Sequence, residues 1–366
     1  MNTIGIVGAT GAVGRVVART LDAWGLGQLR IGGRDERRCQ RLVRTELGGR
    51  GQAYRVDAQD PASLSAFAEG CQAVVNCAGP SLRILDRVAG AALAAGADYV
   101  DAAGDDAVHE LLRGQVPAGR AALISAGMMP GLSALLPRYL AGSCGGLTAL
   151  TGFQGGRDRF TAASAADYLA ALRSGYGESF AAWRGGTRVD NALRPMVDAV
   201  IPFFPRPVTA QPFLSTEAER VARSLRLDEL SWYTVFDGPQ VQLALGRMPA
   251  RGAPAAVSEL AETLCAAAEL DLFGHEPYQL FVLHADGESG RRTLILRGGA
   301  SALTGATAAV AARCLLEGER PDGVRFAGEF LDPARTVDLV RETGAVDAFD
   351  VVAAVPGAEA VEEGAL

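Results

Sequence analysis

The stretch Gly8-Ala9-Thr10-Gly11-Ala12-Val13-Gly14 decides the fold of this chain. It joins an apolar strand pattern at residues 3–7 to a helical pattern at residues 12–21. Its glycines have the spacing of a nucleotide-binding turn. The first allows a tight exit from the strand, the second lets the backbone approach a pyrophosphate, and the third permits close helix packing. Because the first N–H groups of the helix would donate to phosphates, we predict that all seven residues bind a dinucleotide.

Composition and charge describe an ordinary globular protein and exclude several classes. Of the 366 residues, 49% are hydrophobic and 21% are charged, and the net charge of -7 argues against a nucleic-acid partner. The six cysteines include no C-x-x-C pair, and the three histidines give no zinc spacing. We therefore predict no metal site and free thiols in a cytoplasmic protein.

The sequence predicts neither a secretory signal nor a membrane-spanning helix. The first residues lack the cationic segment of a secretory signal. Glycines and prolines interrupt the two uncharged runs that flank Arg138, so these runs do not form the long apolar helix that a bilayer needs.

Strand and helix patterns alternate through residues 1–145, the predicted dinucleotide-binding domain. We expect strands at 29–32, 53–56, 73–77, 99–101 and 121–125, and helices at 35–47, 61–69 and 82–95. Asp60 and Pro61 form a start signal for one of these helices. The strand at 73–77 is apolar as far as Asn76, as in a sheet covered on both faces. The predicted fold class is α/β, a Rossmann-type doubly wound parallel sheet.

The rest of the chain is assigned to three parts. Residues 146–297 form a second, mixed α+β domain for substrate and homodimer contacts, because strand-like runs recur at 232–236, 241–245 and 278–284. Asp286-Gly287 predicts a hairpin that pairs residues 281–285 with 293–297. Residues 298–350 are a return segment on the first domain, with a tightly packed small-residue helix at 304–316. Residues 351–366 are a tail with the composition of a disordered segment.

The end of the second strand distinguishes NAD from NADP. An acidic side chain there binds the ribose 2′-hydroxyl, whereas a 2′-phosphate needs a cation, and this chain has Arg34 at that place. A guanidinium stacks on adenine and bonds a phosphate. The sequence therefore favours NADP, with NADPH preferred over NADH. Arg37, Arg38, Arg41 and Arg44 follow, and their alternative role is the solvated face of a helix.

Two further strand ends are assigned to the cofactor. Asp57 follows the third strand beside Ala58 and either accepts a bond from the adenine amine or caps its loop. Cys77-Ala78-Gly79-Pro80 ends the fourth strand. Its small residues let the backbone approach the ribose and nicotinamide, and Pro80 prevents further ladder pairing.

Several blocks share their order and spacing with a known family. Besides the glycine turn they are Gly33-Arg34-Asp35, residues 75–80, residues 97–105 and Ser125-Ala126-Gly127-Met128-Met129-Pro130-Gly131. Together these blocks resemble the saccharopine dehydrogenase-like family. The resemblance implies a Rossmann domain completed by C-terminal elements, and a reductase or dehydrogenase that uses NAD(P) on imines or on enoyl double bonds. From these blocks Gly104, Gly127 and Met128 are also assigned to the cofactor.

The resemblance also raises questions about the substrate. A saccharopine enzyme handles a substrate with several carboxylates, for which converging arginines are expected. The candidates are Arg157, Arg159, Arg173, Arg184, Arg188 and Arg194. Two departures stand out, because Asp105 takes the place where family members often carry Glu, and an aromatic residue that often precedes the return-segment threonine is missing.

The catalytic candidates are Tyr99, Asp101 and Asp105, at the carboxyl end of a parallel strand where such sheets bind ligands. Asp101 would orient a proton donor or hold an iminium charge, and Tyr99 would donate from its hydroxyl. The alternative is that Tyr99 belongs to the core and Asp101 caps the next helix. His109 is expected on the exposed side of its helix.

These observations favour an NADP-dependent reductase that transfers a hydride to a C=N bond of a small molecule in a cleft between the two domains. An enoyl reductase acting on a carrier-bound or lipid-like substrate is the competing hypothesis. It would need a donor such as Tyr99 at the enolate oxygen. A non-catalytic NADP-binding regulator is the third.

Overall fold

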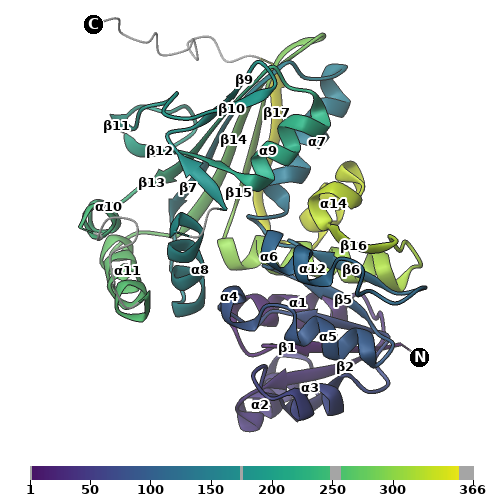
Figure 1. Ribbon diagram of the computed structural model, residues 1–366. Helices are drawn as coiled ribbons and strands as arrows, with labels where there is room; N and C mark the ends of the chain where they lie inside the picture. Colours follow the sequence, from purple (N-terminus) through teal and green to yellow (C-terminus); the bar gives the residue numbers. More distant parts are fainter. Residues whose placement is uncertain (1, 174–175, 248–256, 354–366) are drawn as a thin grey trace, which may run out of the picture.

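The computed structural model describes residues 2–173, 176–247 and 257–353. The chain forms two β-sheets, and Figure 1 shows the first sheet at the bottom of the molecule and the second above it. One hydrophobic core runs from the first sheet through the helix α12, Ala300–Leu316, to the second sheet. The two sheets are therefore parts of one packed body.

The first sheet has seven strands, all parallel, in the order β16-β6-β5-β4-β1-β2-β3. The strands are β1 (Thr3–Val7), β2 (Gln28–Gly33), β3 (Gln52–Arg55), β4 (Ala73–Asn76), β5 (Asp98–Asp101), β6 (Ala121–Ile124) and β16 (Gly323–Phe326). This arrangement confirms the predicted Rossmann-type sheet. Its parallel strands place the carboxyl ends of β1 and β4 side by side, where the strand order reverses and ligands bind.

Helices cover both faces of this sheet. They are α1 (Ala12–Ala23), α2 (Glu36–Glu46), α3 (Pro61–Ala68), α4 (Ser81–Ile84), α5 (Arg87–Ala94) and α6 (Asp106–Leu112). The helix α7 (Leu132–Cys144) packs instead against the second sheet. The Asp60 carboxylate accepts a bond from Ala62 N, which confirms the predicted helix start. On the opposite face α12 packs against α1, where a Cβ on Gly305 would lie 2.5 Å from Val16 Cβ. The prediction of a tightly packed small-residue helix is confirmed, although it begins at Ala300.

The predicted helix at 82–95 is wrong in one respect. The chain makes two helices, α4 and α5, separated by Leu85, whose φ is 50°. A residue in the left-handed region ends an α-helix, so the segment turns before α5 begins.

The second sheet is mixed and has the path β10-β9-β13-β7-β14-β15-β17, while β12 pairs with β13, β11 and β8. Its strands are β7 (Ala149–Arg157), β8 (Gly177–Ser179), β9 (Ala182–Arg184), β10 (Thr187–Val189), β11 (Met196–Ala199), β12 (Val208–Ser215), β13 (Glu229–Phe236), β14 (Tyr278–Gly287), β15 (Gly290–Gly298) and β17 (Val346–Ala353). The remaining helices are α8 (Ala162–Arg173), α9 (Thr216–Leu225), α10 (Pro239–Gly246), α11 (Val257–Leu272), α13 (Ala327–Phe330) and α14 (Pro333–Glu342). Residues 203–207 lie in the loop between β11 and β12, and β14 pairs with β15 as predicted.

Two local predictions in the second domain are wrong. Residues 241–245 lie in the helix α10, because Pro239 stands at its first position and the Asp271 carboxylate accepts bonds from Gln240 N and Val241 N. The hairpin turn lies at residues 288–289, since Gly287 pairs with Gly290 and the ladder continues past Asp286.

The C-terminal boundaries also differ from the prediction. β16 joins the first sheet, but β17 pairs with β15 and completes the edge of the second sheet. The return segment therefore serves both sheets, and residues 351–353 are strand rather than tail. The remainder of the predicted tail, residues 354–366, lies outside the described residues.

Candidate active site

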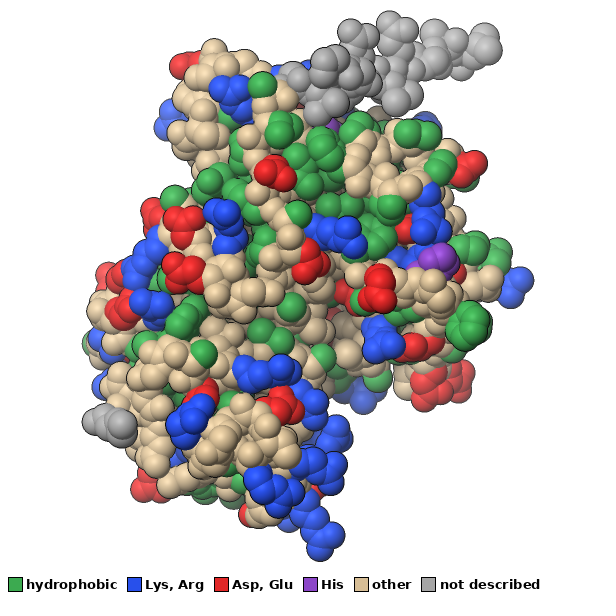
Figure 2. All heavy atoms as spheres, turned by 180° about the vertical axis from the view of Figure 1, so that it is seen from behind, with side chains coloured by type: hydrophobic (Ala, Val, Ile, Leu, Met, Phe, Trp, Pro, Cys, Tyr) green, Lys and Arg blue, Asp and Glu red, His purple; other side chains and the backbone are tan. Residues whose placement is uncertain are grey.

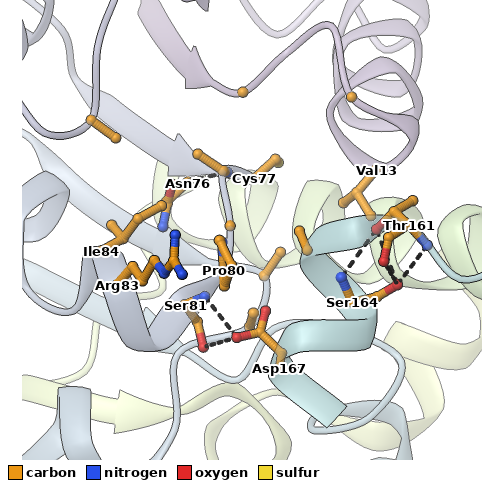
Figure 3. A pocket seen from close by; sticks show the side chains of 18 of the residues that line it. Val13, Asn76, Cys77, Pro80, Ser81, Arg83, Ile84, Thr161, Ser164 and Asp167 are labelled. Atoms are coloured by element: carbon orange, nitrogen blue, oxygen red, sulfur yellow. Dashed lines mark hydrogen bonds between the residues drawn. The ribbon is translucent and has the colours of Figure 1, made fainter. Parts of the chain in front are cut away.

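A cleft of about 1140 Å³ lies between the carboxyl ends of the first sheet and α8. Its glycine-turn end is lined by residues that follow β1, β2 and β3, among them Gly11, Arg34 and Asp57. Its α8 end is lined by residues that follow β4, β5 and β6, by α8 and by the start of α12. Figure 3 shows Asp167 facing Ser81 of the loop after β4, while Thr161 and Ser164 are bonded to each other near Val13.

The glycine turn has the geometry that its sequence predicts. Gly8 has φ of +77°, and a Cβ there would lie 2.7 Å from Ala78 N, so only glycine fits. A Cβ on Gly14 would lie 2.4 Å from Gly8 O, which explains the close helix packing. Gly11 differs, because its Cβ would meet only Gly8 O at 3.2 Å and otherwise point into space that the cleft occupies. Gly8, Thr10, Gly11, Ala12 and Val13 line the cleft, whereas Ala9 and Gly14 support it from behind.

The glycine-turn end is basic. Arg34 and Arg38 line the cleft beside Gly33, and both are exposed. Figure 2 shows Arg side chains gathered at the bottom of the molecule, where Figure 1 places α2. Asp57 lines the same end with Ala58, and its carboxylate accepts a bond from Gln59 N at 2.9 Å, so Asp57 caps its loop as the alternative prediction proposed.

The loop after β4 forms the middle of the cleft. Cys77, Ala78, Gly79 and Pro80 all line it. Burial raises the pKa of the Cys77 thiol, so this side chain stays neutral. A Cβ on Gly79 would lie 3.0 Å from Ala163 Cβ, which shows how closely α8 approaches this loop.

Tyr99 and Asp101 lie beneath the cleft floor and do not line it. The Asp101 carboxylate accepts bonds from Tyr99 OH at 2.5 Å, Asn76 Nδ2 at 3.2 Å, Ala103 N at 2.9 Å and Gly104 N at 2.8 Å. Four donors occupy this buried carboxylate. The geometry is that of a core tyrosine and a loop cap, and does not support direct substrate contact by either residue.

Asp105 is the catalytic candidate that the structure places in the cleft. Its Oδ1 lies 3.1 Å from Arg220 Nη2, and Arg220 Nη1 and Nε also reach Asp106 Oδ1 at 2.5 Å and Glu329 Oε1 at 3.3 Å. Burial raises the pKa of the Asp105 carboxyl, while Arg220 opposes that rise. This carboxyl therefore takes up a proton more readily than a solvated aspartate does.

Glu217 connects the second domain to the loop after β6. Its carboxylate accepts bonds from Gly131 N at 2.7 Å and from Ser133 Oγ, and Met129 and Pro130 of that loop line the cleft. Burial raises the pKa of Glu217 to about 7. Sequence reasoning missed Glu217, because nothing near it in the sequence indicates that it meets residue 131.

Asp167 on α8 is the second carboxyl at the α8 end. Its Oδ1 accepts bonds from Ser81 N at 2.8 Å and Ser81 Oγ at 3.1 Å (Figure 3). Burial raises the pKa of this carboxyl. Sequence reasoning missed it together with Tyr168 and Tyr176, which also line the cleft. The available signal was a lone acid within the alanine-rich pattern of residues 162–171.

Among the described side chains, the candidate arginines do not converge on one site. Arg157 is buried and bonds the Asp237 side chain and carbonyl, and Arg184, Arg188 and Arg194 bond groups of the second domain. Arg159 lines the cleft and lies 3.4 Å from Glu269. The side chain of Arg173 lies outside the described part.

Several remaining candidates lie near the cleft without lining it. Gly104, Gly127 and Met128 are behind its wall, and Met128 N donates to Thr304 Oγ1, which does line it. His109 is not on an exposed face, because its ring stacks on Phe326 with centroids 4.7 Å apart.

His275 lies in the loop between α11 and β14. His284 lies in β14, and its Nδ1 is 2.9 Å from Thr293 Oγ1. Neither histidine lines the cleft.

Three further observations on the described residues concern metal centres, disulfides and membrane-spanning helices. Within the described ranges, no group of three or more His, Cys, Asp or Glu side chains is placed to hold a metal ion. The six cysteines are free thiols. None of the described helices is long and apolar enough to cross a membrane.

Comparisons with known proteins agree with this geometry. Residues 4–128 match the family model of the saccharopine dehydrogenase NADP binding domain. The fold is similar to that of the apo, histidine-tagged saccharopine dehydrogenase (L-Glu forming) of Saccharomyces cerevisiae, with a TM-score of 0.67 and 15% identity over 96% of this chain and 100% of that one. A myo-inositol dehydrogenase of Corynebacterium glutamicum gives a TM-score of 0.47 at 13% identity over 97% of this chain and 99% of that one. No curated protein matches the sequence.

Proposed function

We propose that this chain, a saccharopine dehydrogenase-like oxidoreductase with an NADP-binding domain, reduces the C=N bond of a small imine with a hydride from NADPH. The residues of the glycine-turn end fit that cofactor. Gly11 leaves open the space that a Cβ would fill, the first N–H groups of α1 face it, and Arg34 and Arg38 supply cations for a 2′-phosphate. When bound, the nicotinamide supplies the hydride.

The pair of carboxyls at the α8 end carries the choice of a C=N bond. Asp105 and Asp167 line the cleft beyond the loop after β4, and burial raises the pKa of each carboxyl. A carboxyl with a raised pKa keeps its proton to a higher pH than a solvated carboxyl does, and it can deliver that proton to an imine nitrogen and then hold the resulting cation. Protonation makes the imine carbon a better hydride acceptor, so these two residues supply what the reaction needs besides the hydride.

The test is the oxidation of NADPH across a panel of imines, enoyl thioesters and ketones. We expect turnover with imines, and we expect Asp167→Asn to lower that turnover while NADPH binding is unchanged. Asp347→Asn, an exposed aspartate on β17, is the matched control. NADPH binding without oxidation of any panel member would show a cofactor-binding regulator instead.

Enoyl reduction is a second candidate, because Tyr168 and Tyr176 line the same end of the cleft. A phenol hydroxyl stabilises the developing enolate oxygen that a C=C reduction produces. Activity on enoyl thioesters but not imines, lost in Tyr176→Phe and retained in Asp167→Asn, would favour this candidate over the first.

A further inference from the structure

Asp105 precedes the helix α6 but does not cap it. It stands at the N-cap position, where an aspartate side chain usually accepts a bond from one of the first helical N–H groups. Its side chain makes no such bond. The carboxylate lies in the wall of the cleft instead, with 24% of the side chain exposed. The usual reason for an aspartate at this position therefore does not apply to Asp105, and its partners are found on other elements.

The main bond to this carboxylate comes from the second domain. Arg220 Nη2, on α9, donates to Asp105 Oδ1 at 3.1 Å. Ser125 Oγ lies 3.5 Å from the same oxygen, but it donates to the carbonyl of Gly104 at 2.8 Å. Within residues 2–173, 176–247 and 257–353, no group of another element bonds Asp105 Oδ2. The arrangement leaves that oxygen for a ligand.

Arg220 is itself fixed by elements that surround it. Its Cζ lies 3.7 Å from the centroid of the Phe326 ring at the end of β16. Its Nη1 donates to Asp106 Oδ1 on α6, and its Nε lies 3.3 Å from Glu329 Oε1 on α13. Only 18% of the side chain is exposed. A planar guanidinium can meet one ring and three carboxylates at once, which the point charge of a lysine cannot do.

A second side chain of α9 joins this helix to the wall of the cleft. Glu217 lies three residues before Arg220, on the same face of the helix. Its carboxylate accepts a bond from Gly131 N at 2.7 Å, in the loop after β6. Met129 of that loop lines the cleft. α9 thus contacts the first domain at two neighbouring points, and these contacts define where the guanidinium of Arg220 stands.

The charges near Asp105 act in opposite directions. Burial raises the pKa of its carboxyl, Arg220 lowers that pKa, and Asp106 raises it. The other titratable groups of this neighbourhood lie on α9, before β8 and on α13, and they are Glu217, Tyr176 and Glu329. Because Arg220 is the cation of the group, its removal would raise the pKa of Asp105.

Resting on the proposed function, we propose that Arg220 is a positioning residue for imine reduction, which holds Asp105 from the second domain as the acid that protonates the imine nitrogen. The carboxyl of Asp105 gives its proton to that nitrogen, the imine carbon accepts the hydride, and the resulting carboxylate regains a proton from water. Arg220 does not line the cleft. It therefore acts through Asp105, and the acid of the first domain depends on a side chain of the second.

The test compares the pH profile of kcat for imine reduction in the wild type and in Arg220→Gln. An acid acts only while it is protonated, so kcat falls as pH rises through its pKa. Arg220→Gln removes the charge that lowers this pKa. We expect the alkaline fall of kcat to move to higher pH, and the maximal kcat to drop at least roughly tenfold because the carboxyl is no longer oriented. NADPH binding should be unchanged.

Two further variants separate this role from a general effect on the fold. Arg223→Gln, one turn further along α9 with 57% of its side chain exposed, should leave the pH profile unchanged. In an Asp105→Asn background, Arg220→Gln should lower kcat by less than roughly twofold, because the group that it positions is gone. Arg220→Lys keeps a cation without the planar fork, so it should show an intermediate kcat.

The titration of Asp105 also gives a readout that needs no turnover. Carboxyl-carbon NMR of aspartate-labelled protein follows it directly, and the signal of Asp105 is the one missing from Asp105→Asn. We expect a higher pKa for this signal in Arg220→Gln than in the wild type, and no change in Arg223→Gln.

Equal loss of kcat through Arg220→Gln in the wild-type and the Asp105→Asn backgrounds, or an unmoved Asp105 signal, would overturn the inference and leave Arg220 as a structural contact between the domains. If Arg220→Gln does not fold, Arg220→Lys replaces it, and a wild-type kcat in that variant would overturn the inference. A protein that reduces no imine contradicts the proposed function. In that case a raised pKa of Asp105 in Arg220→Gln still supports the hold of Arg220 on this carboxyl, whereas an unmoved signal overturns the inference as well.

Discussion

At the glycine-turn end of the cleft the chain offers backbone from one short segment, whereas at the α8 end it offers side chains from segments far apart in sequence. Gly8, Gly11 and Gly14 lie within seven residues, and each position is decided by contacts with its immediate neighbours or with the loop after β4. At the α8 end, Asp105 follows β5 in the first domain, whereas Asp167 on α8 and Glu217 on α9 belong to the second domain. The shape of the glycine-turn end is therefore set by the local backbone, whereas the arrangement of side chains at the α8 end depends on how the two domains pack.

The largest effect on cofactor binding is expected at Gly11, in the glycine-turn end of the cleft. Gly11→Val places a branched side chain in the space that the cofactor needs, while its Cβ meets only Gly8 O at 3.2 Å within the protein. We expect loss of NADPH and NADH binding alike, by more than roughly a hundredfold, with a nearly unchanged melting temperature. Equilibrium binding and thermal unfolding measure the two quantities.

Gly14→Ala is the matched control for that experiment. Its Cβ would lie 2.4 Å from Gly8 O and 2.6 Å from Ala9 Cα, both of them backbone atoms. This variant should lower the melting temperature instead. If Gly11→Val still binds NADPH, the cofactor does not cross the glycine turn.

How much the sequence predicts follows the same division. The glycine turn, Arg34 and the loop at residues 77–80 were predicted, because their determinants are local and repeat a known spacing. Asp167 and Glu217 were missed, because each acquires its role from a partner 86 positions away in sequence. Tyr99 and Asp101 were placed at the correct strand end but at the wrong depth, since a strand-end rule does not tell which side chains turn under the floor.

A smaller effect is expected at Glu217, which tests how the α8 end depends on domain packing. Burial raises the pKa of its carboxyl from 4.5 to about 7. The folded protein therefore binds a proton more tightly than the unfolded chain, and stability falls as pH rises from about 4.5 to about 7. Glu217→Gln removes this titration and keeps an oxygen that accepts from Gly131 N. The variant should gain stability over the wild type across that window, by at most about 3 kcal/mol.

Urea unfolding at several pH values measures this difference. Glu342→Gln, an exposed glutamate on α14, provides the control and should show no such trend. A gap between variant and wild type that stays constant from acidic to weakly basic pH would mean that the pKa of Glu217 is the same in the folded and the unfolded protein. The link between α9 and the loop at residue 131 would then rest on an ordinary charged acceptor.

The smallest effect is expected at Arg34, where the glycine-turn end adds a side chain to its backbone contacts. Arg34 is exposed and lines the cleft beside Arg38. Its guanidinium is therefore placed to meet the 2′-phosphate that distinguishes NADP from NAD. Loss of one charge-assisted bond at an exposed position costs about 1.5 kcal/mol, so Arg34→Ala should weaken NADPH roughly tenfold and NADH hardly at all. Arg41→Ala, exposed on the following helix α2 but outside the cleft, should leave both affinities unchanged. Because phosphate attraction is screened by salt, the NADPH deficit should shrink as ionic strength rises. Equal weakening of both cofactors would instead assign Arg34 to the adenine, by stacking, and leave selectivity for the phosphate to Arg38.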